Sequence, residues 1–193
     1  VGSEMCIRDS TRTVRDSAMM LQVLSGFDIR DPNSMRDIPP DFLSDLESGI
    51  DGLRIAWSSN LGYAAVDPEV IQVTIKAAKA FEELGCIVDD HTFGLDDPLP
   101  SFVDIFATNA YTSYGHILED QIEDLTAYAL VNLEHGRRTT GADYARALRH
   151  VEVMRARIDD LFQNYDILLT PTMPVPSFYI GQHPTKIGVK EVN

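Results

Sequence analysis

The chain has 193 residues, 44% of them hydrophobic and 24% charged, which is typical of a globular domain with a sizeable apolar core. Its formal net charge of −14 is spread along the sequence and argues against a nucleic-acid or anionic-membrane surface, because like charges repel. No apolar run approaches the length of a membrane span, and the two cysteines, Cys6 and Cys86, are too few for a disulfide framework or a zinc site.

The first expected helix begins at Thr13. Thr13 and Asp16 form a capping-box-like start, because the hydroxyl accepts an amide of the first turn and the carboxylate complements the helix dipole. Apolar residues then recur at helical spacing: Val14, Ala18, Leu21 and Leu24. Gly26 is a natural stop, and residues 27–52 have the composition of a loop, with one short helical turn expected around residues 42–46.

A strand, a helix and a second strand follow. Residues 53–57 predict a short strand, and Asp67 and Pro68 are typical of an N-cap followed by proline at the first helical position. The apolar stripe expected on this helix is Val70, Val73, Ala77, Phe81 and Leu84. Gly85 ends the helix and residues 86–88 begin the next strand, so the order predicts a parallel pair with a right-handed connection.

Residues 101–134 are expected to be mostly helical, and Thr140 and Asp143 form another capping box that opens a long helix. One face of that helix is expected to carry Tyr144, Leu148, Val151, Met154, Ile158 and Leu161. Residues 166–170 then predict a buried strand. The fold class that follows is α/β, with a mixed β-sheet flanked by helices and a helical region in the middle of the chain.

Several residue types that carry chemistry have no spacing that organises them into a site. The acidic pairs, such as Asp89 and Asp90, lack the ligand spacing of a calcium loop and are expected to be solvated. The five histidines are scattered and are expected at the surface or at helix ends. Ser58 follows a strand without the glycines of a nucleophile elbow, and Cys86 enters a strand as a buried small residue. These patterns predict no catalytic residue and no metal site.

The stretch Thr170, Pro171 and Thr172 is the best candidate for substrate binding. It follows the carboxyl end of a predicted strand, where ligands gather in α/β folds, and its hydroxyls are suited to lining a pocket. An ordinary proline-containing turn fits the same residues. Reasoning from the residues alone therefore names no reaction.

A resemblance to a known family goes further. The segments that carry it, in chain order, are Thr11–Asp16, Gly26–Pro32, Leu53–Trp57 with Gly62–Pro68, Gly136–Tyr144 and Asp166–Thr172. Together they cover nearly everything from Thr11 onward. On these segments the chain resembles the amidase signature family, the serine amidohydrolases.

The resemblance implies hydrolysis of a carboxylic amide by a serine nucleophile, which a second serine on a cis peptide bond bridges to a lysine base. Backbone amides would hold the oxyanion, and no cofactor is implied. In the family both serines and the lysine lie upstream of the segment that begins here at Thr11. Residues 11–193 are therefore expected to be a partial amidase domain, truncated at both ends and inactive by itself.

For the parent enzyme the resemblance implies a small-molecule amide substrate and a cytoplasmic location. It implies no nucleic-acid or membrane partner, and a homodimer is one of the assemblies that it allows. Two alternatives stay open: the catalytic subunit of a tRNA-dependent amidotransferase, and a non-catalytic α/β binding protein. The aromatic residues of the helical region also have two interpretations, an apolar acyl pocket or the core of a helical pair. They are Phe102, Phe106, Tyr111 and Tyr114.

Residues 1–10, VGSEMCIRDS, have no helical or strand period. The string resembles the translation of an adaptor end used in transposase-based sequencing libraries. We therefore expect these ten residues to be adaptor-derived rather than part of the domain.

Overall fold

The computed structural model describes residues 10–32, 34–44, 46–120 and 122–192. The expectation for residues 1–10 lies, apart from Ser10, outside the described residues. The chain forms two compact units that divide between Asp51 and Gly52, and each is described by itself.

The first unit contains one helix, α2 (Val14–Leu24), among its described residues. The hydroxyl of Thr13 accepts the backbone N–H of Asp16, which confirms the expected cap. The backbone N–H of Phe42 donates to Gln22 Oε1 at 3.0 Å and fastens the following loop to the helix. The expected apolar face is not buried, because the described part of this unit offers no second helix or strand to cover it; only Ala18 is buried on α2.

The second unit is built on a three-stranded parallel sheet. Its strands are β1 (Arg54–Trp57), β2 (Ile87–Asp90) and β3 (Ile167–Leu169), in the order β2-β1-β3. Ile55 pairs with Val88 on one side and with Ile167 on the other, both in parallel register. The central position of β1 explains why its Ile55 and Ala56 are fully buried, whereas β3, at the edge, is only half-buried.

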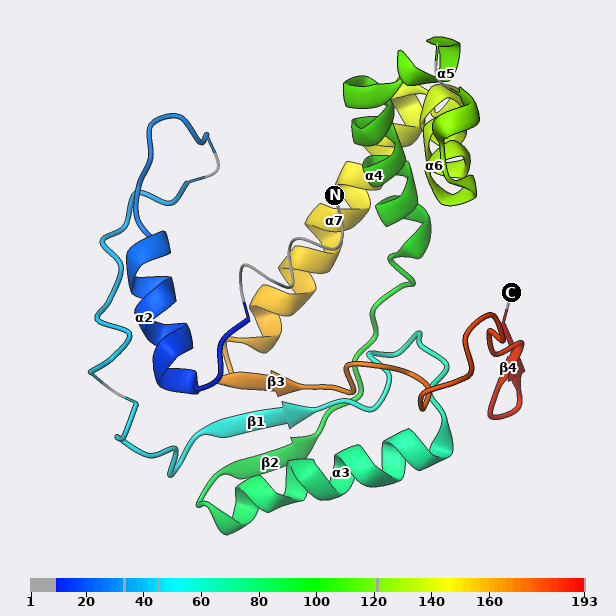
Figure 1. Ribbon diagram of the computed structural model, residues 1–193. Helices are drawn as coiled ribbons and strands as arrows, with labels where there is room; N and C mark the ends of the chain where they lie inside the picture. The colour runs from blue at the N-terminus through cyan, green and yellow to red at the C-terminus, as the bar shows by residue number, and fades with distance from the viewer. Residues whose placement is uncertain (1–9, 33, 45, 121, 193) are drawn as a thin grey trace. The chain divides into compact units, whose positions relative to one another are not determined.

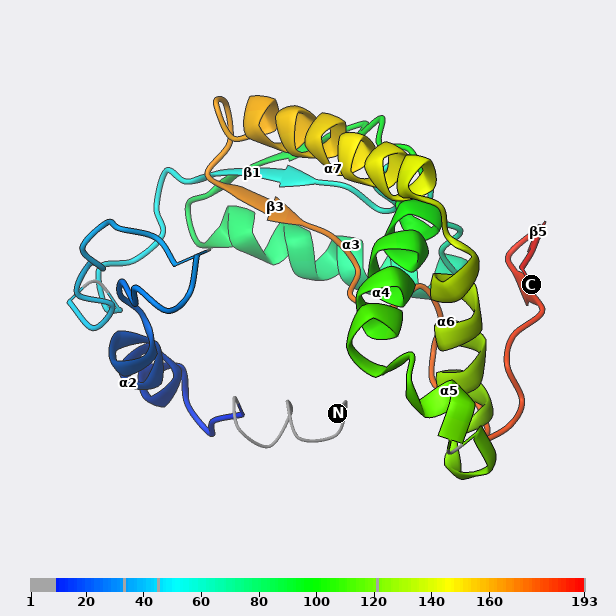
Figure 2. The same cartoon turned by 90° about the horizontal axis from the view of Figure 1, so that it is seen from above.

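Helices cover the two faces of this sheet (Figures 1 and 2). The crossover helix α3 (Pro68–Glu83) joins β1 to β2 on one face, and α7 (Gly141–Leu161) leads into β3 on the other. The core under α7 is formed by Ala56, Phe93, Leu95 and Leu161, against which Met154 and Ile158 pack. The predicted parallel βαβ unit and the α/β fold class are therefore confirmed.

The buried stripe of α3 differs in phase from the prediction, and that of α7 differs at two positions. On α3 the buried residue is Ala78, and Val73 is 62% exposed. On α7 the buried residue near the start is Ala147, and Leu148 and Val151 are exposed. Helix α3 carries two overlapping apolar stripes, and apolar spacing alone could not choose which of them is covered. On α7 the predicted face is otherwise found, with Leu161 buried and Tyr144, Met154 and Ile158 half-buried.

A layer of helices lies between β2 and β3 in the chain. It comprises α4 (Leu99–Tyr114), α5 (Ile117–Asp120), the 3₁₀ turn η1 (Ile122–Asp124) and α6 (Ala127–Arg138). Helix α4 packs against both α6 and α7 (Figure 2). The approach to α6 is close at Gly136, where a Cβ atom would lie 2.0 Å from the carbonyl oxygen of Ala107. The predicted helical region in the middle of the chain is confirmed.

The sequence did not predict the hairpin near the C-terminus, β4 (Lys186–Ile187) with β5 (Lys190–Glu191). Strands of two residues are too short to show an alternating pattern. No helix in the described part of the chain combines the length and the apolar character needed to cross a membrane.

The contact at Gly136 generates a prediction. Gly136→Ala should lower the free energy of unfolding by about 2 kcal/mol or more, because the new methyl group forces α4 and α6 apart. Gly141→Ala is the matched control: it lies in α7 with open space around its Cβ position, and should change stability by at most about 1 kcal/mol, in the stabilising direction. Urea unfolding followed by far-UV circular dichroism measures both, and equal effects would contradict the packing described here.

Candidate functional site

The carboxyl ends of the three parallel strands meet at one edge of the sheet. The segments that follow them are residues 58–64 after β1, 91–98 after β2 and 170–174 after β3. The backbone ladder continues into two of these segments: Ser58 N–H donates to the Leu169 carbonyl at 3.0 Å, and His91 N–H donates to the Trp57 carbonyl at 2.7 Å. Ligands of α/β folds bind at this edge, so it is the first place to look for a site.

Ser58 lies at this edge but serves the turn. Its side chain is only 2% exposed, and its hydroxyl accepts the backbone N–H of Leu61 at 3.1 Å. The interpretation of Ser58 as a strand-end turn residue is confirmed. Among the described residues, this hydroxyl makes no hydrogen bond to a side chain that could act as a base.

The loops after β1 and β2 are locked together next to Ser58. Gly62 has φ +90°, and a Cβ atom there would lie 1.8 Å from the carbonyl oxygen of Phe93. Leu95 N–H donates to the Leu61 carbonyl at 3.2 Å. A side chain at residue 62 would both strain the backbone and separate the loops, so glycine fixes the geometry of this edge.

The Thr170–Thr172 segment is held in place by its neighbour. The Pro174 carbonyl accepts the backbone N–H of Asp67, the N-cap of α3, at 2.8 Å. Thr170 and Thr172 are exposed and Pro171 is half-buried. Neither threonine hydroxyl has a hydrogen-bond partner in the part of the chain that the structure describes. The segment thus presents two hydroxyls from an anchored loop.

An apolar groove of about 600 Å³ lies between α4 and α7. Phe102 and Phe106 form part of its wall, with ring centroids 5.6 Å apart and planes inclined by 13°, and both rings are partly exposed. The remaining lining residues are Pro98, Ser101, Ile105, Asn109, Val151, Met154, Arg155 and Ile158. Of the four aromatic residues with two interpretations, Phe102 and Phe106 line a groove, Tyr111 packs against Gly136 of α6, and Tyr114 is exposed.

One polar pair sits within this apolar contact. Ser101 Oγ of α4 and His150 Nδ1 of α7 are 2.7 Å apart. His150 Nε2 is buried and has no partner in the described residues. The prediction that histidines lie at the surface or at helix ends is wrong for His150, which is half-buried in the middle of α7 because that face packs against α4.

A second, smaller cavity of about 320 Å³ lies beside the C-terminal end of α7, lined by His91, Phe93, Gly94, Arg157, Asp160, Leu161, Asn164 and Tyr165. Arg157 donates to the Gly94 carbonyl and lies 3.6 Å from an Asp96 carboxylate oxygen. Burial, reinforced by the negative charge of Asp89, raises the pKa of Tyr165. Arg157 is thus paired with groups of the protein, and no other arginine or lysine lines this cavity.

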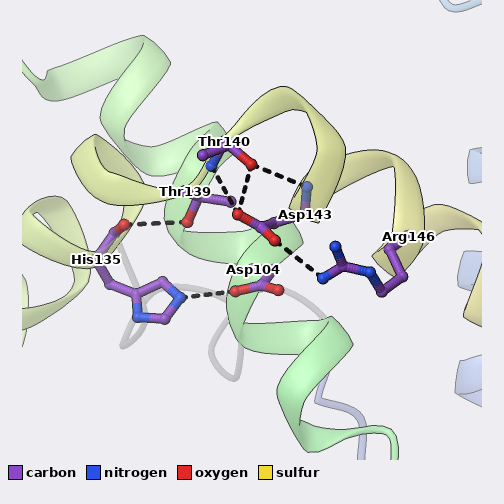
Figure 3. Close-up of polar contacts among 6 residues, drawn as sticks. All are labelled: Asp104, His135, Thr139, Thr140, Asp143 and Arg146. Atoms are coloured by element: carbon purple, nitrogen blue, oxygen red, sulfur yellow. Dashed lines mark hydrogen bonds and ion pairs between the residues drawn. The ribbon is translucent and has the colours of Figure 1, made fainter.

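The most connected polar cluster is structural (Figure 3). His135 of α6 lies 2.8 Å from Asp104 of α4, and Thr140 and Asp143 form the predicted capping box of α7, which is confirmed. Arg146 donates to Asp143 at 2.9 Å. One of these contacts joins α6 to α4, and the others stabilise the start of α7.

Metal-ligating residues do not gather. The described residues contain no group of three or more His, Cys, Asp or Glu side chains placed to hold a metal ion. Asp89 lies 3.8 Å from Arg54 in an exposed ion pair, and Cys86 is buried, as predicted.

Comparison with known proteins identifies a family, which the geometry alone does not. A model of the family described as Amidase matches residues 10–192. The chain is 33% identical over 173 residues to an amidase of Pseudomonas putida, an alignment that covers 89% of this chain and 37% of that protein. It is also 33% identical to an acylamidase of Rhodococcus erythropolis, over 89% of this chain and 36% of that protein.

Two further similarities are relevant. The chain is 28% identical to a glutamyl-tRNA(Gln) amidotransferase subunit of Rubrobacter xylanophilus, over 89% of this chain and 41% of that protein. A bacterial aryl acylamidase of the amidase signature enzymes has the same fold, with a TM-score of 0.81 and 26% identity over 95% of this chain and 40% of that one. The chain spans well under half the length of each of these relatives.

The capping box generates a prediction of pH dependence. Hydrogen bonds from the Thr140 side chain, then from the Thr140 backbone amide and Arg146, hold the pKa of Asp143 below its ordinary value of 3.8. A carboxyl whose pKa is lowered by folding stabilises the fold above its unfolded-state pKa and loses that contribution as the pH falls through the folded-state value. Asp143→Asn should therefore destabilise the protein at neutral pH, and the difference should shrink as the pH falls below 3.8.

Urea midpoints of the two proteins across this pH range measure the effect. Asp159→Asn, which exchanges an exposed carboxylate of α7 outside the capping box, is the control and should show no such pH dependence. A destabilisation by Asp143→Asn that is the same at acid and neutral pH would contradict the role given to the ionised carboxylate.

Proposed function

Because the chain belongs to the amidase family, we propose that it is part of an enzyme that hydrolyses a carboxylic amide to an acid and ammonia or an amine. The reaction would pass through a serine acyl-enzyme, with the serine nucleophile, the bridging serine and the lysine base supplied by a segment outside this chain. Residues 11–193 would supply part of the amidase domain and of its substrate side. The family match over residues 10–192 is the observation that carries this proposal.

The substrate-side role falls on Thr170, Pro171 and Thr172. Three observations support it: the loop lies at the carboxyl edge of the sheet, the Asp67–Pro174 hydrogen bond anchors it, and its threonine hydroxyls are exposed. An anchored hydroxyl costs little further ordering when it binds a polar group of a substrate. The loop would thus orient the substrate, and it needs no cofactor to do so.

The groove between α4 and α7 would hold the apolar part of the amide. Phe102 and Phe106 present partly exposed rings in a groove of about 600 Å³, within the volume range of small-molecule sites. The similarity to an acylamidase and to an aryl acylamidase supports a substrate with an apolar acyl or aryl group.

A second candidate is the catalytic subunit of a tRNA-dependent amidotransferase. The similarity to the glutamyl-tRNA(Gln) amidotransferase protein of Rubrobacter xylanophilus favours it, at 28% identity against 33% for the amidase and the acylamidase. The stand-alone hydrolase is therefore preferred, and hydrolysis of amides other than glutamine distinguishes the two.

The proposed function predicts how the chain behaves by itself. Purified residues 1–193 should hydrolyse acetanilide, acetamide and glutamine no faster than buffer, because the proposal assigns the nucleophile and its base to a segment outside this chain. Product release measured by chromatography, together with intact-protein mass spectrometry, tests this. An initial burst of product with an acylated protein would contradict that assignment.

The second prediction concerns the loop in the full-length enzyme. Thr172→Val removes a hydroxyl at nearly constant volume and should lower kcat/KM by about tenfold, the effect of one lost hydrogen bond to the substrate. Thr112→Val, an exposed position on α4 far along the chain from this loop, should leave kcat/KM unchanged. If both variants keep the kcat/KM of the unsubstituted enzyme, Thr172 is an ordinary turn residue.

A further inference from the structure

Ser101 is a polar residue in the wall of an otherwise mostly apolar groove. Its hydroxyl lies 2.7 Å from His150 Nδ1, across the α4–α7 contact and 49 residues away in the chain. The other polar residue of α4 in the wall is Asn109, whose Oδ1 accepts the phenolic hydrogen of Tyr144 at 3.4 Å and whose amide group is thereby held in place. Arg155 carries the one charge among the described residues that line the groove.

The buried nitrogen of His150 indicates which partner donates. If the Ser101 hydroxyl donated to Nδ1, the imidazole proton would sit on Nε2, which is buried without a partner in the described residues. If Nδ1–H donates to Ser101 Oγ instead, Nε2 is left as an unprotonated acceptor. An orphaned buried N–H is rarer in proteins than an under-used acceptor, so the second arrangement is favoured.

That arrangement leaves the Ser101 hydroxyl hydrogen available. His150 holds the oxygen through its Nδ1–H, and because Ser101 lines the groove, a ligand in the groove can accept the hydroxyl hydrogen. The neighbouring wall consists of the stacked rings of Phe102 and Phe106, 58% and 39% exposed. A flat apolar ring stacks on such a wall, and a hydrogen-bond acceptor attached to the ring meets the hydroxyl.

We propose that Ser101, positioned by His150, is a specificity-determining residue that selects an aromatic ligand bearing a neutral hydrogen-bond acceptor. The ligand is an aryl group with a carbonyl or ether oxygen, distinct from the amide that is cleaved. The proposal rests on the proposed function in treating this aryl group as part of the amide substrate. Ser101, His150 and the two phenylalanines all belong to this chain.

The test compares two isosteric probes, acetophenone and α-methylstyrene, which differ only in a carbonyl oxygen against a methylene group. Each is titrated into the full chain with ¹³C-labelled Ile and Met methyl groups, and the NMR shifts of Ile105, Met154 and Ile158 report occupancy of the groove. Acetophenone should bind about fivefold more tightly, the value of one hydrogen bond. Neither probe is hydrolysable, so the catalytic serine does not enter the comparison. The guanidinium of Arg155 also lines the groove and can donate to the acetophenone carbonyl, so the Ser101 variants decide which donor is responsible.

Four variants complete the design. Ser101→Ala should reduce the affinity ratio to about one by weakening acetophenone alone, and Ser101→Thr, which keeps a hydroxyl, should preserve most of the ratio. His150→Phe keeps a ring and removes the nitrogen, so the ratio should fall between these two. Ser113→Ala makes the same substitution at an exposed position of α4 outside the groove and should leave the ratio unchanged.

An unchanged ratio in Ser101→Ala would overturn the proposal, and so would the absence of groove methyl shifts with either probe. Because binding is measured without turnover, a parent enzyme that cleaves no amide would remove the proposed function and leave the selectivity in place. Hydrolysis without the selectivity would remove only the role of Ser101.

Discussion

The central strand β1 hydrogen-bonds to β2 on one side and to β3 on the other, both in parallel, and the rest of the second unit depends on these two ladders. Parallel neighbours require crossover connections, so the chain between β1 and β2 must form α3, and the chain between β2 and β3 must form the helical layer and α7. Burial of Ile55 and Ala56 between these two coverings supplies the apolar contact that holds the three layers together.

The same pairing determines where function can lie. The carboxyl ends of the three parallel strands meet at one edge of the sheet. There Gly62 lies against the Phe93 carbonyl, and the Pro174 carbonyl accepts the backbone N–H of Asp67, the N-cap of α3. The long return from β2 to β3 brings α4 against α7 and forms the groove that contains Ser101 and His150. In the proposed function, these two places face the substrate, and the catalytic groups come from a part of the enzyme outside this chain.

Local signals in the sequence predicted the helices and strands well, because a helix cap or a short strand is set by residues adjacent in the chain. Thr13, Asp67 and Thr140 cap helices as expected, and the strand–helix–strand order is found. The predictions that failed depend on partners distant in the chain. They concern which of two apolar stripes on α3 is covered, and the position of His150, which contacts Ser101 across 49 residues. The resemblance to amidases named the family, and neither periodicity nor spacing would have done so.

The central claim is that this chain is the substrate-side part of an amidase whose nucleophile and base lie in a preceding segment. Sequencing the source DNA outward from the Thr11 codon tests it most directly. The account predicts that the reading frame continues upstream into a glycine- and serine-rich segment with a lysine before it, and that VGSEMCIRDS is absent from the gene. If those ten residues are instead encoded behind a start site, the protein never carried the catalytic serines, and the non-catalytic binding protein becomes the correct interpretation.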